Sequence, residues 1–336
     1  MTIKDLAEKT GYSVATISRV LNNQPNVSEK AREEIRKLVE ECGYQINVNA
    51  KQLKQHANSI LVVVKGTANE MFGEMVETIQ TLVSKTSYPL HVDYMDEDCN
   101  EVLRAVQLCR EKKPLGILFL GGNLENFRED FGRIDIPCVV LTNDMSTLDY
   151  PNLSSITVDD VEACRSAVDS LFALGHRKIA VIGGEVEESG VGRARFAGCM
   201  KAIQSHGLAF DPEKDFRGVR FSYQAGYEAA RDLLETGREF TALATASDVM
   251  AVGAIRALHE KGLKVPEDVS VIGFDNLMEC RYSYPKLTTV SQSTEQKAAK
   301  VSKLLFSRIR GEEENAELVK HDVEVVIRQS VRDFRR

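Results

Sequence analysis

Most of the chain, from residue 59 onward, alternates short apolar runs with longer amphipathic stretches. Short apolar runs predict buried strands, and apolar positions that recur every three or four residues predict helices. Strands are expected at 60–64, 90–94, 116–120, 138–142, 178–182, 242–245, 269–273 and 318–327. Helices are expected around 72–84, 100–111, 124–131, 160–174, 193–205, 225–235, 249–260 and 295–310. Continuous apolar strands between helices are typical of parallel sheets covered on both faces, so we expect two doubly wound α/β subdomains.

The first 45 residues contain three stretches with a helical pattern, separated by a short turn and a loop. A first helix ends near Gly11, which can take the left-handed backbone conformation that stops a helix. Ser13 can cap a second helix over 14–22, and Ser28 can cap a third over 29–41. This pattern predicts a small all-α unit that begins with a helix-turn-helix.

The second helix has two different faces. Its inner face is apolar and consists of Ile17, Val20 and Leu21. Its outer face is small, hydroxyl-bearing and cationic, and consists of Ala15, Ser18, Arg19 and Asn22. Such a face suits a helix in the DNA major groove, where an arginine can bond two acceptors on a guanine edge. The alternative is an ordinary helical hairpin with a solvated outer face.

Composition and charge narrow the class of protein. The chain has 336 residues, of which 43% are hydrophobic and 28% charged, as in ordinary globular proteins. No apolar run approaches the roughly twenty residues of a membrane helix, and Met1 leads directly into a predicted helix, so we expect a cytoplasmic protein without a membrane span. Residues 1–58 hold 9 Lys and Arg against 7 Asp and Glu, whereas the remainder holds 34 against 43. Only the N-terminal part has a positive net charge, which suits binding to nucleic acid, and this charge is small.

The sequence offers little support for catalysis. Seven scattered cysteines form no Cys-x-x-Cys pair and no metal-ligand spacing with the histidines, which favours reduced structural thiols. Gly190-Val-Gly192-Arg-Ala-Arg195 begins like a dinucleotide-binding loop but has arginine in place of the third glycine. There is no Walker lysine after Gly183-Gly184 and no Gly-x-Ser-x-Gly elbow. We therefore expect no enzyme, no metal and no cofactor.

Several N-terminal motifs occur together: Thr2-Ile-Lys-Asp-Leu-Ala, Ser13-x-x-Thr16-Ile-Ser18-Arg19-Val-Leu-Asn22, Asn26-Val27-Ser28 and Gly43-Tyr44. They resemble the DNA-binding headpiece of the LacI-type (lactose-repressor and galactose-repressor) family of bacterial transcription regulators. The resemblance implies a hinge helix on operator DNA, with Leu53 as the side chain that wedges into the minor groove. It implies base contacts by Val14, Ala15 and Arg19, phosphate contacts by Thr16, Ser18 and Asn22, and hinge contacts by Asn47, Ala50 and Leu53.

The headpiece departs from the family pattern at three positions. The family usually has a proline where Ile46 stands, an arginine where Lys51 stands and a small aliphatic residue where Tyr12 stands. Because proline stiffens the backbone, its loss predicts a less pre-organised hinge and a different strength of coupling between effector and DNA.

Motifs farther along the chain also resemble this family, whose regulatory domain is similar to periplasmic sugar-binding proteins. They are Leu174-Gly-His-Arg-Lys-Ile-Ala-Val-Ile-Gly-Gly184, Arg195-Phe-Ala-Gly198, Ser247-Asp248-Val-Met-Ala-Val-Gly253, Val265-Pro-Glu-Asp-Val-Ser-Val-Ile-Gly-Phe-Asp275 and Pro285-Lys-Leu-Thr-Thr-Val290. The resemblance implies a cleft in which Arg195 clamps the effector, Asp275 accepts sugar hydroxyls, Phe221 packs on the ligand ring, and Ser247 replaces the usual asparagine. We add Lys65, at the end of the first strand, as a residue that could favour an anionic effector.

Each of these residues also has a purely structural interpretation. Arg195 could pair at the surface with Glu187 or Glu188, Asp275 could cap the next helix, Phe221 could be core, and Lys65 could be solvated. Asp248 is expected to cap the helix over 249–260 rather than to touch ligand.

The expected organisation is a headpiece at 1–45, a hinge at 46–58 and two regulatory subdomains. The first subdomain comprises 59–159 with about 291–317, and the second comprises 160–290 with about 318–330. By resemblance the chain is expected to be a repressor that binds a pseudopalindromic operator as a homodimer or a tetramer. A small-molecule effector is expected to control it, and we expect this effector to be a carbohydrate. The rivals are a solute-binding protein, which the headpiece and the missing signal peptide count against, and an α/β enzyme.

Overall fold

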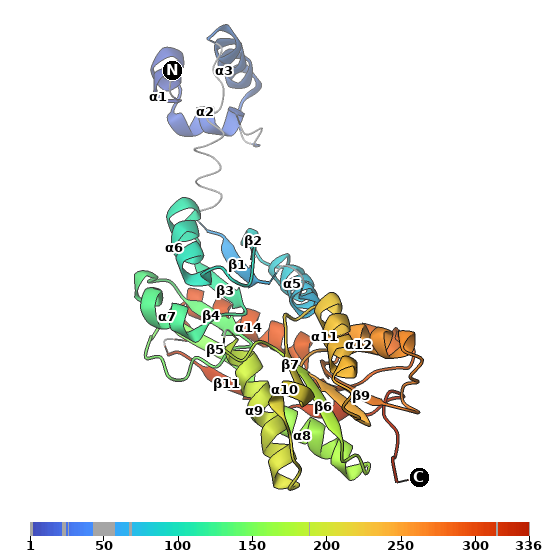
Figure 1. Ribbon diagram of the computed structural model, residues 1–336. Coiled ribbons are helices and arrows are strands. Elements are labelled where there is room, and N and C mark those ends of the chain that lie inside the picture. The colour runs from blue at the N-terminus through green and yellow to red at the C-terminus, as the bar shows by residue number, and fades with distance from the viewer. Residues whose placement is uncertain are drawn as a thin grey trace. The chain divides into compact units, whose positions relative to one another are not determined.

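The computed structural model describes residues 3–21, 25, 27–42, 58–66, 69–187, 189–313 and 315–335 (Figure 1). The chain divides into two compact units, residues 1–55 and 56–336. We describe each unit by itself, and we call the helices of the first unit the headpiece.

The headpiece contains α1 (Ile3–Thr10), α2 (Val14–Leu21) and α3 (Glu29–Glu41). Local chemistry determines where these helices begin and end. Gly11 has a positive φ of 70°, and the Ser13 hydroxyl accepts a hydrogen bond from the backbone N–H of Thr16 at 3.1 Å. Ser28 caps α3 in the same way through Ala31. The predicted turn and both caps are therefore confirmed, and the core beneath them consists of Leu6, Ile17, Val20 and Ile35.

The first lobe of the larger unit is built on a six-stranded parallel sheet, ordered β11-β5-β4-β3-β1-β2. Its strands are β1 (Ile60–Lys65), β2 (Leu90–Met95), β3 (Gly116–Leu120), β4 (Cys138–Leu141), β5 (Leu153–Val158) and β11 (Leu318–His321). One face is covered by α5 (Glu70–Val83) and α14 (Thr294–Ile309), and the other by α6 (Glu101–Lys112) and α7 (Leu124–Asp130). A 3-10 turn, η1 (Phe131–Arg133), follows α7.

The second lobe has a sheet ordered β12-β10-β9-β8-β6-β7, in which only β12 is antiparallel to its neighbour among the described strands. Its strands are β6 (Ile179–Gly183), β7 (Phe216–Gly218), β8 (Ala242–Thr245), β9 (Ser270–Asp275), β10 (Thr288–Ser291) and β12 (Glu324–Val326). The helices α8 (Asp160–Ala173) and α9 (Gly190–Ser205) cover one face, and α11 (Tyr223–Glu235) and α12 (Asp248–Glu260) cover the other (Figure 1). Two single turns, α10 (Pro212–Asp215) and α13 (Glu279–Tyr282), lie in connecting segments.

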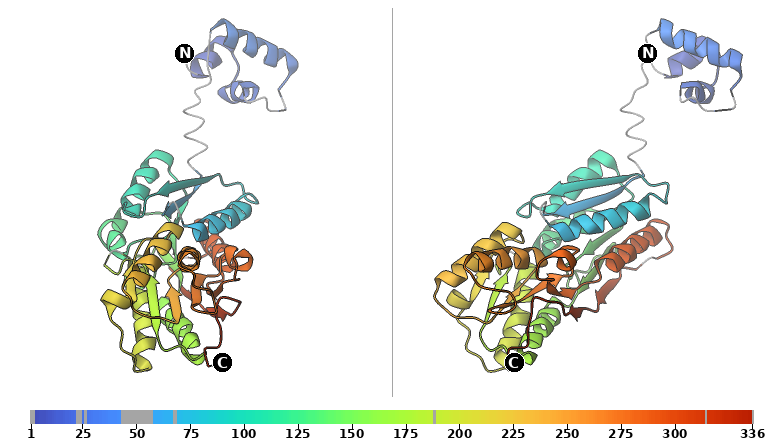
Figure 2. Two further views of the ribbon diagram at one scale, coloured as in Figure 1. Left: turned by 45° about the vertical axis from the view of Figure 1, so that its right-hand side comes forward. Right: turned by 90° about the vertical axis from the view of Figure 1, so that its right-hand side faces the viewer.

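The chain passes between the lobes three times. It leaves the first sheet after β5, returns from β10 to α14, and leaves again between β11 and β12. As a result α14, near the C-terminal end, packs beside α5 of the first lobe (Figure 2). The fold is thus the expected pair of doubly wound α/β lobes with an all-α headpiece.

Two predictions about the strands were wrong. The single strand expected over 318–327 is two strands in different sheets, so residues 318–321 belong to the first lobe and the last crossing lies beyond residue 321. In addition, β5, β7 and β10 were missed. The sequences of β5 and β10 are rich in Ser and Thr, whose hydroxyls are buried but satisfied: Thr157 donates to the carbonyl of Thr142, and Thr289 donates to Asp248. Apolar content alone does not identify such strands.

None of the helices in the described part of the chain is long and apolar enough to cross a lipid bilayer.

Candidate functional site

The outer side of α2 is the candidate DNA-reading surface. Ile17 and Val20 are buried beneath it, whereas Ala15 and Arg19 are exposed and Val14 retains 41% of its surface. Thr16 and Ser18 are half-buried on the same helix. The structure therefore brings Val14, Ala15, Thr16, Ser18 and Arg19 together on one short helix. The other predicted DNA contacts, Asn22, Asn47, Ala50 and Leu53, lie outside the described residues.

Tyr12 gives the turn before α2 a contact that sequence patterns did not predict. Its hydroxyl donates a hydrogen bond to a carboxylate oxygen of Glu34 on α3, at 2.7 Å. This bond also raises the pKa of Tyr12 above its usual value. The turn that presents α2 is thereby tied to α3 by a side chain for which the family usually has a small aliphatic residue.

A cavity of about 420 Å³ lies between the two lobes of the larger unit, and we call it the ligand cleft. It is at the carboxyl ends of the strands, where Lys65 ends β1 and Asp275 ends β9. Open α/β sheets bind ligands at this edge. Its lining combines amides, carboxylates, aromatic rings and glycines, including Asn69, Phe72, Asn123, Asn143, Glu185 and Ser222. Four of the five predicted effector residues, Lys65, Arg195, Phe221 and Asp275, line it as well.

Arg195 lies in the wall of the ligand cleft with only 4% of its surface exposed. Its Nε donates to Asp160 at 2.8 Å, and one terminal nitrogen lies 3.7 Å from a carboxylate oxygen of Asp275. The guanidinium also stacks 3.8 Å above the ring of Phe274. Arg195 therefore does not pair with Glu187 at the surface. It is a buried, oriented cation, and such planar donors suit paired oxygen acceptors.

Asp275 is the acceptor opposite Arg195. It ends β9 with a φ of 118°, a strained conformation for a residue with a side chain, and strained residues often occur at binding sites. Burial raises the pKa of Asp275 to about 6, although Arg195, Gln292 and Lys297 all act to lower it. Its carboxylate accepts a hydrogen bond from Gln292 and does not cap a helix in the described structure.

Phe221 is half-buried in the ligand cleft, and its position depends on a glycine. A Cβ at Gly184 would lie 2.7 Å from the ring of Phe221, and one at Gly192 would lie 2.9 Å from the backbone of Gly184. Gly184, from the rejected Walker candidate, and Gly192, from the stretch that resembled a dinucleotide loop, therefore allow β6, α9 and Phe221 to approach one another closely.

Two predicted roles need correction. Ser247 is buried and lies outside the ligand cleft, because its hydroxyl caps α12 by accepting from the N–H of Met250. Asp248 was the expected cap, but its carboxylate accepts from the N–H of Leu277 at 2.9 Å and from the hydroxyl of Thr289 at 2.6 Å. Ser247, one position before Asp248, has the geometry of the cap. A sequence motif does not distinguish between two such neighbouring residues.

The suggested preference of Lys65 for an anionic effector is not supported. Its Nζ lies 2.5 Å from a carboxylate oxygen of Glu101, which is completely buried. Glu101 also accepts from the N–H of Asn123 at 2.6 Å and from the side-chain amide of Asn126 at 2.9 Å. Because Glu101 neutralises the ammonium group, Lys65 presents little net charge to a ligand.

An ion-pair cluster that joins the two lobes at the ligand cleft escaped the sequence analysis. Arg220, between β7 and α11, pairs with Glu97 at 2.8 Å and with Asp98, both of which lie between β2 and α6. All three residues line the cleft. The partners are more than 120 positions apart in the chain, so no local pattern predicts them.

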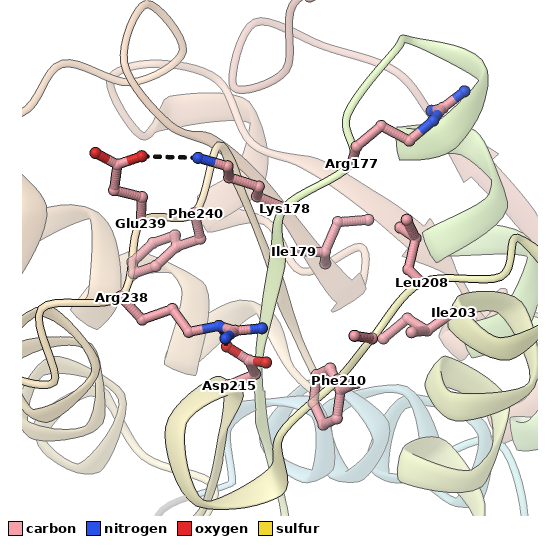
Figure 3. Close-up of a pocket in the computed structure, with 11 residues that line it drawn as sticks. Arg177, Lys178, Ile179, Ile203, Leu208, Phe210, Asp215, Arg238, Glu239 and Phe240 are labelled. Atoms are coloured by element: carbon pink, nitrogen blue, oxygen red, sulfur yellow. Dashed lines mark hydrogen bonds and ion pairs between the residues drawn. The ribbon is translucent and has the colours of Figure 1, made fainter.

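A second cavity, of about 330 Å³, lies at the opposite end of β6 (Figure 3). Ile179, Ile203 and Phe210 give it apolar walls, and ion pairs join Arg238 to Asp215 and Lys178 to Glu239. It is at the amino ends of the strands, away from the edge where such sheets bind ligands. The ligand cleft is therefore the candidate site.

Comparisons with known proteins agree with this geometry. Residues 2–47 match the model for bacterial regulatory proteins of the lacI family, and residues 168–331 match a periplasmic binding protein-like domain. The chain is 34% identical to the transcriptional regulator MalR of Clostridium butyricum, over 98% of this chain and 99% of that protein. It is 31% identical to the transcriptional repressor CytR of Escherichia coli K12, over 98% and 96% of the two chains.

Solved structures give the same result. A lac repressor dimer bound to operator and the anti-inducer ONPF superposes with a TM-score of 0.75 at 26% identity, over 99% of both chains. A complex of the regulator CelR with cellobiose has a TM-score of 0.68 at 25% identity, over 98% of this chain and 99% of that one. These relatives are transcription regulators, not enzymes. The chain therefore belongs to the lacI family of bacterial regulatory proteins and is a DNA-binding transcription regulator controlled through its periplasmic-binding-protein-like domain.

Proposed function

We propose that this regulator is a dimeric repressor whose affinity for a pseudopalindromic operator is set by a neutral carbohydrate in the ligand cleft. The observation that carries the proposal is the buried pair of Arg195 and Asp275, which faces a cavity between two lobes in a chain that also has a helix-turn-helix headpiece. Such a regulator acts on DNA in the cytoplasm.

The chemistry of the ligand cleft favours a sugar. A sugar hydroxyl both donates and accepts hydrogen bonds, so it can donate to Asp275 and accept from Arg195 or from the amides of Asn69 and Asn143. The apolar face of a sugar ring can pack on Phe221. Cellobiose is the ligand of the CelR structure to which the chain is similar.

The charges around the ligand cleft favour a neutral sugar over a sugar phosphate. The two cations nearest the strand ends are already paired, Lys65 with Glu101 and Arg195 with Asp160. The same cavity is also lined by three carboxylates, those of Asp96, Glu97 and Asp98, and they outnumber the one positive charge of Arg220 beside them. A phosphate would meet this negative potential without an uncommitted arginine or lysine among these residues.

The second lobe carries a surface that suits a second copy of the chain. Met278, Tyr282 and Tyr284 expose 63%, 80% and 96% of their surfaces within seven residues. Large apolar side chains clustered on a surface are typical of protein interfaces. A dimer would present two α2 helices to two operator half-sites, as helix-turn-helix proteins require. A ligand can change the placement of these two helices only if it binds two different arrangements of the lobes with different affinity.

The direct test uses the full chain in two steps. A thermal-shift screen with cellobiose, other neutral sugars and sugar phosphates identifies the effector, and operator selection from random duplexes followed by gel-shift titration measures DNA binding. We expect a neutral sugar to raise the melting temperature and to change operator affinity. Absence of sequence-dependent DNA binding, both with and without sugar, would disprove the proposed operator-binding repressor. Stabilisation only by sugar phosphates would disprove the neutral effector.

A further inference from the structure

A lysine of the first lobe is buried directly behind the ligand cleft. Lys297, in the first turn of α14, has no exposed surface, and its Nζ donates to the side-chain oxygen of Gln292 at 2.6 Å. Gln292 is also buried and lies in the crossing from β10 to α14. Its amide nitrogen donates to Asp275 at 2.5 Å and approaches the sulfur of Met71 on α5 at 3.6 Å. A continuous chain of contacts thus runs from the ligand cleft to the first lobe.

The direction of these hydrogen bonds follows from the donors and acceptors. An ammonium group can only donate and an ionised carboxylate can only accept, so an amide between them has one favourable orientation. The oxygen of Gln292 must face Lys297, and its NH₂ group must then face Asp275. Without the ammonium group, only Asp275 would orient the amide, and the amide oxygen would lose its buried donor.

The buried cluster around Asp275 is acidic on the side of the second lobe, where Asp248 also interacts with Asp275 and has its pKa raised by burial to about 7. Arg195, Asp160 and Asp275 come from the second lobe, and they leave one negative charge in excess. Lys297 supplies a compensating positive charge from α14, which packs on the first sheet. A buried charge is stable only when it is compensated, so the ionised form of Asp275 depends on this lysine as well as on Arg195.

We propose that Lys297, acting through Gln292, is a positioning residue that holds Asp275 as an ionised hydrogen-bond acceptor facing the ligand cleft. The proposal rests on the ligand role proposed above for Asp275. The same hydrogen bonds through Gln292 would let a ligand bound to Asp275 act on α14, and therefore on the first lobe.

The test is a carboxyl NMR titration of the full chain labelled at Asp ¹³Cγ, with the Asp275 signal assigned by Asp275→Asn. Among the described residues, the titratable groups that interact with Asp275 include Arg195 on α9, Asp160 on α8, Asp248 on α12, Cys280 on α13 and Lys297 on α14. Lys297→Met keeps an unbranched side chain of similar size and removes the ammonium group, and with it both the charge and the hydrogen bond to Gln292. We expect the midpoint of Asp275 to rise from about 6 in the natural chain by roughly half a unit or more.

Two further variants complete the titration. Lys300→Met removes a charge from an exposed position of the same helix and should leave the midpoint unchanged. Gln292→Leu should raise the midpoint as Lys297→Met does, and it serves if the first variant is insoluble. An Asp275 midpoint that is the same in the natural chain, Lys297→Met and Gln292→Leu would overturn the proposal.

A double-mutant cycle in chemical unfolding gives a second readout. Lys297→Met and Asp275→Asn should together destabilise the chain by less than the sum of the single changes, because each single change leaves the other charge uncompensated. Asp275→Asn with Lys300→Met should be additive. Additivity in both cycles would contradict the coupling. Neither experiment uses DNA or ligand, so its failure is distinct from failure of the proposed function.

Discussion

At the residue scale, the ligand cleft depends on a cation that cannot be removed without a stability cost. Arg195 compensates Asp160 and lies near Asp275, and all three side chains are almost completely buried. We expect Arg195→Ala to abolish sugar binding and to lower the free energy of unfolding by about 3–5 kcal/mol, because two buried carboxylates lose their partner. Isothermal calorimetry and chemical unfolding measure the two effects. Lys201→Ala, at an exposed position of α9, is the control, and equal effects of both changes would refute the assignment.

A second residue-scale prediction concerns the glycine beneath Phe221. Gly184→Ala places a Cβ 2.7 Å from the ring of Phe221 and 3.0 Å from Gly192, so the ring must move. We expect sugar affinity to fall, at a stability cost of roughly 1–3 kcal/mol from overpacking. Gly73→Ala, where a Cβ would meet nothing within 4 Å, should leave sugar binding unchanged. Unaltered affinity in Gly184→Ala would show that Phe221 does not contact the ligand.

At the scale of elements, α2 is the helix on which base selection should depend. Arg19 is exposed on it, beside Ala15 and Val14. We expect Arg19→Ala to cost about 1–3 kcal/mol of operator affinity and to relax base preference at one position of each half-site. Competition gel shifts with single-base operator variants measure this preference. Lys37→Ala, on the exposed side of α3, should at most weaken binding to all sequences equally. The same profile for both variants would remove Arg19 from base recognition.

Elements also show how far local sequence predicts this fold. The caps at Ser13 and Ser28 were predicted because each depends on residues three positions apart. The Ser- and Thr-rich strands β5 and β10 were missed because tertiary partners satisfy their hydroxyls. The segment over 318–327 was wrongly predicted as one strand. Its two halves pair with different sheets, and the local sequence pattern does not indicate this.

At the scale of the whole molecule, acidic groups of the two lobes meet where α5 contacts α13. Glu279 begins α13 of the second lobe, and burial together with its contact with Glu70 on α5 raises the pKa of Glu279 to about 7. Glu74, also on α5, accepts a hydrogen bond from the N–H of Met278 at 3.3 Å. The contact between α5 and α13 is therefore sensitive to protonation.

The sign of the resulting pH dependence follows from linkage. A carboxyl whose pKa is higher in the folded chain stabilises the fold while protonated, and this contribution is lost as pH rises from about 4.5 through about 7. The raised pKa values of Asp275 and Asp248, about 6 and about 7, act in the same direction.

Burial lowers the pKa values of His176 and His321, which act in the opposite direction over this range. Because three carboxyls stand against two imidazoles, we expect a higher melting temperature near pH 5 than near pH 8. Glu279→Gln should reduce that difference, whereas Glu129→Gln, at an exposed position, should not. A flat profile in the natural chain would contradict this prediction.

The proposed dimer gives the last prediction. Tyr282→Asp introduces a charge into the exposed apolar cluster of Met278, Tyr282 and Tyr284, and we expect it to produce monomers with weaker operator binding. Light scattering after size exclusion measures the mass. Tyr282→Phe keeps the ring and should remain dimeric. If Tyr282→Asp is still a dimer, another surface joins the two copies.

The sequence by itself determined the class of fold, the helix-turn-helix and the family, because periodicity, capping residues and ordered motifs are local properties of the chain. It also identified Arg195, Phe221 and Asp275 as residues of the ligand cleft. Only the tertiary structure decided their partners. Asp160, Gln292 and Lys297 reach the same cluster from distant parts of the chain, and burial there makes each charge depend on the others. The tertiary structure also showed that Ser247 lies outside the cleft and that Lys65 pairs with Glu101. Such contacts depend on packing between elements and not on the order of residues.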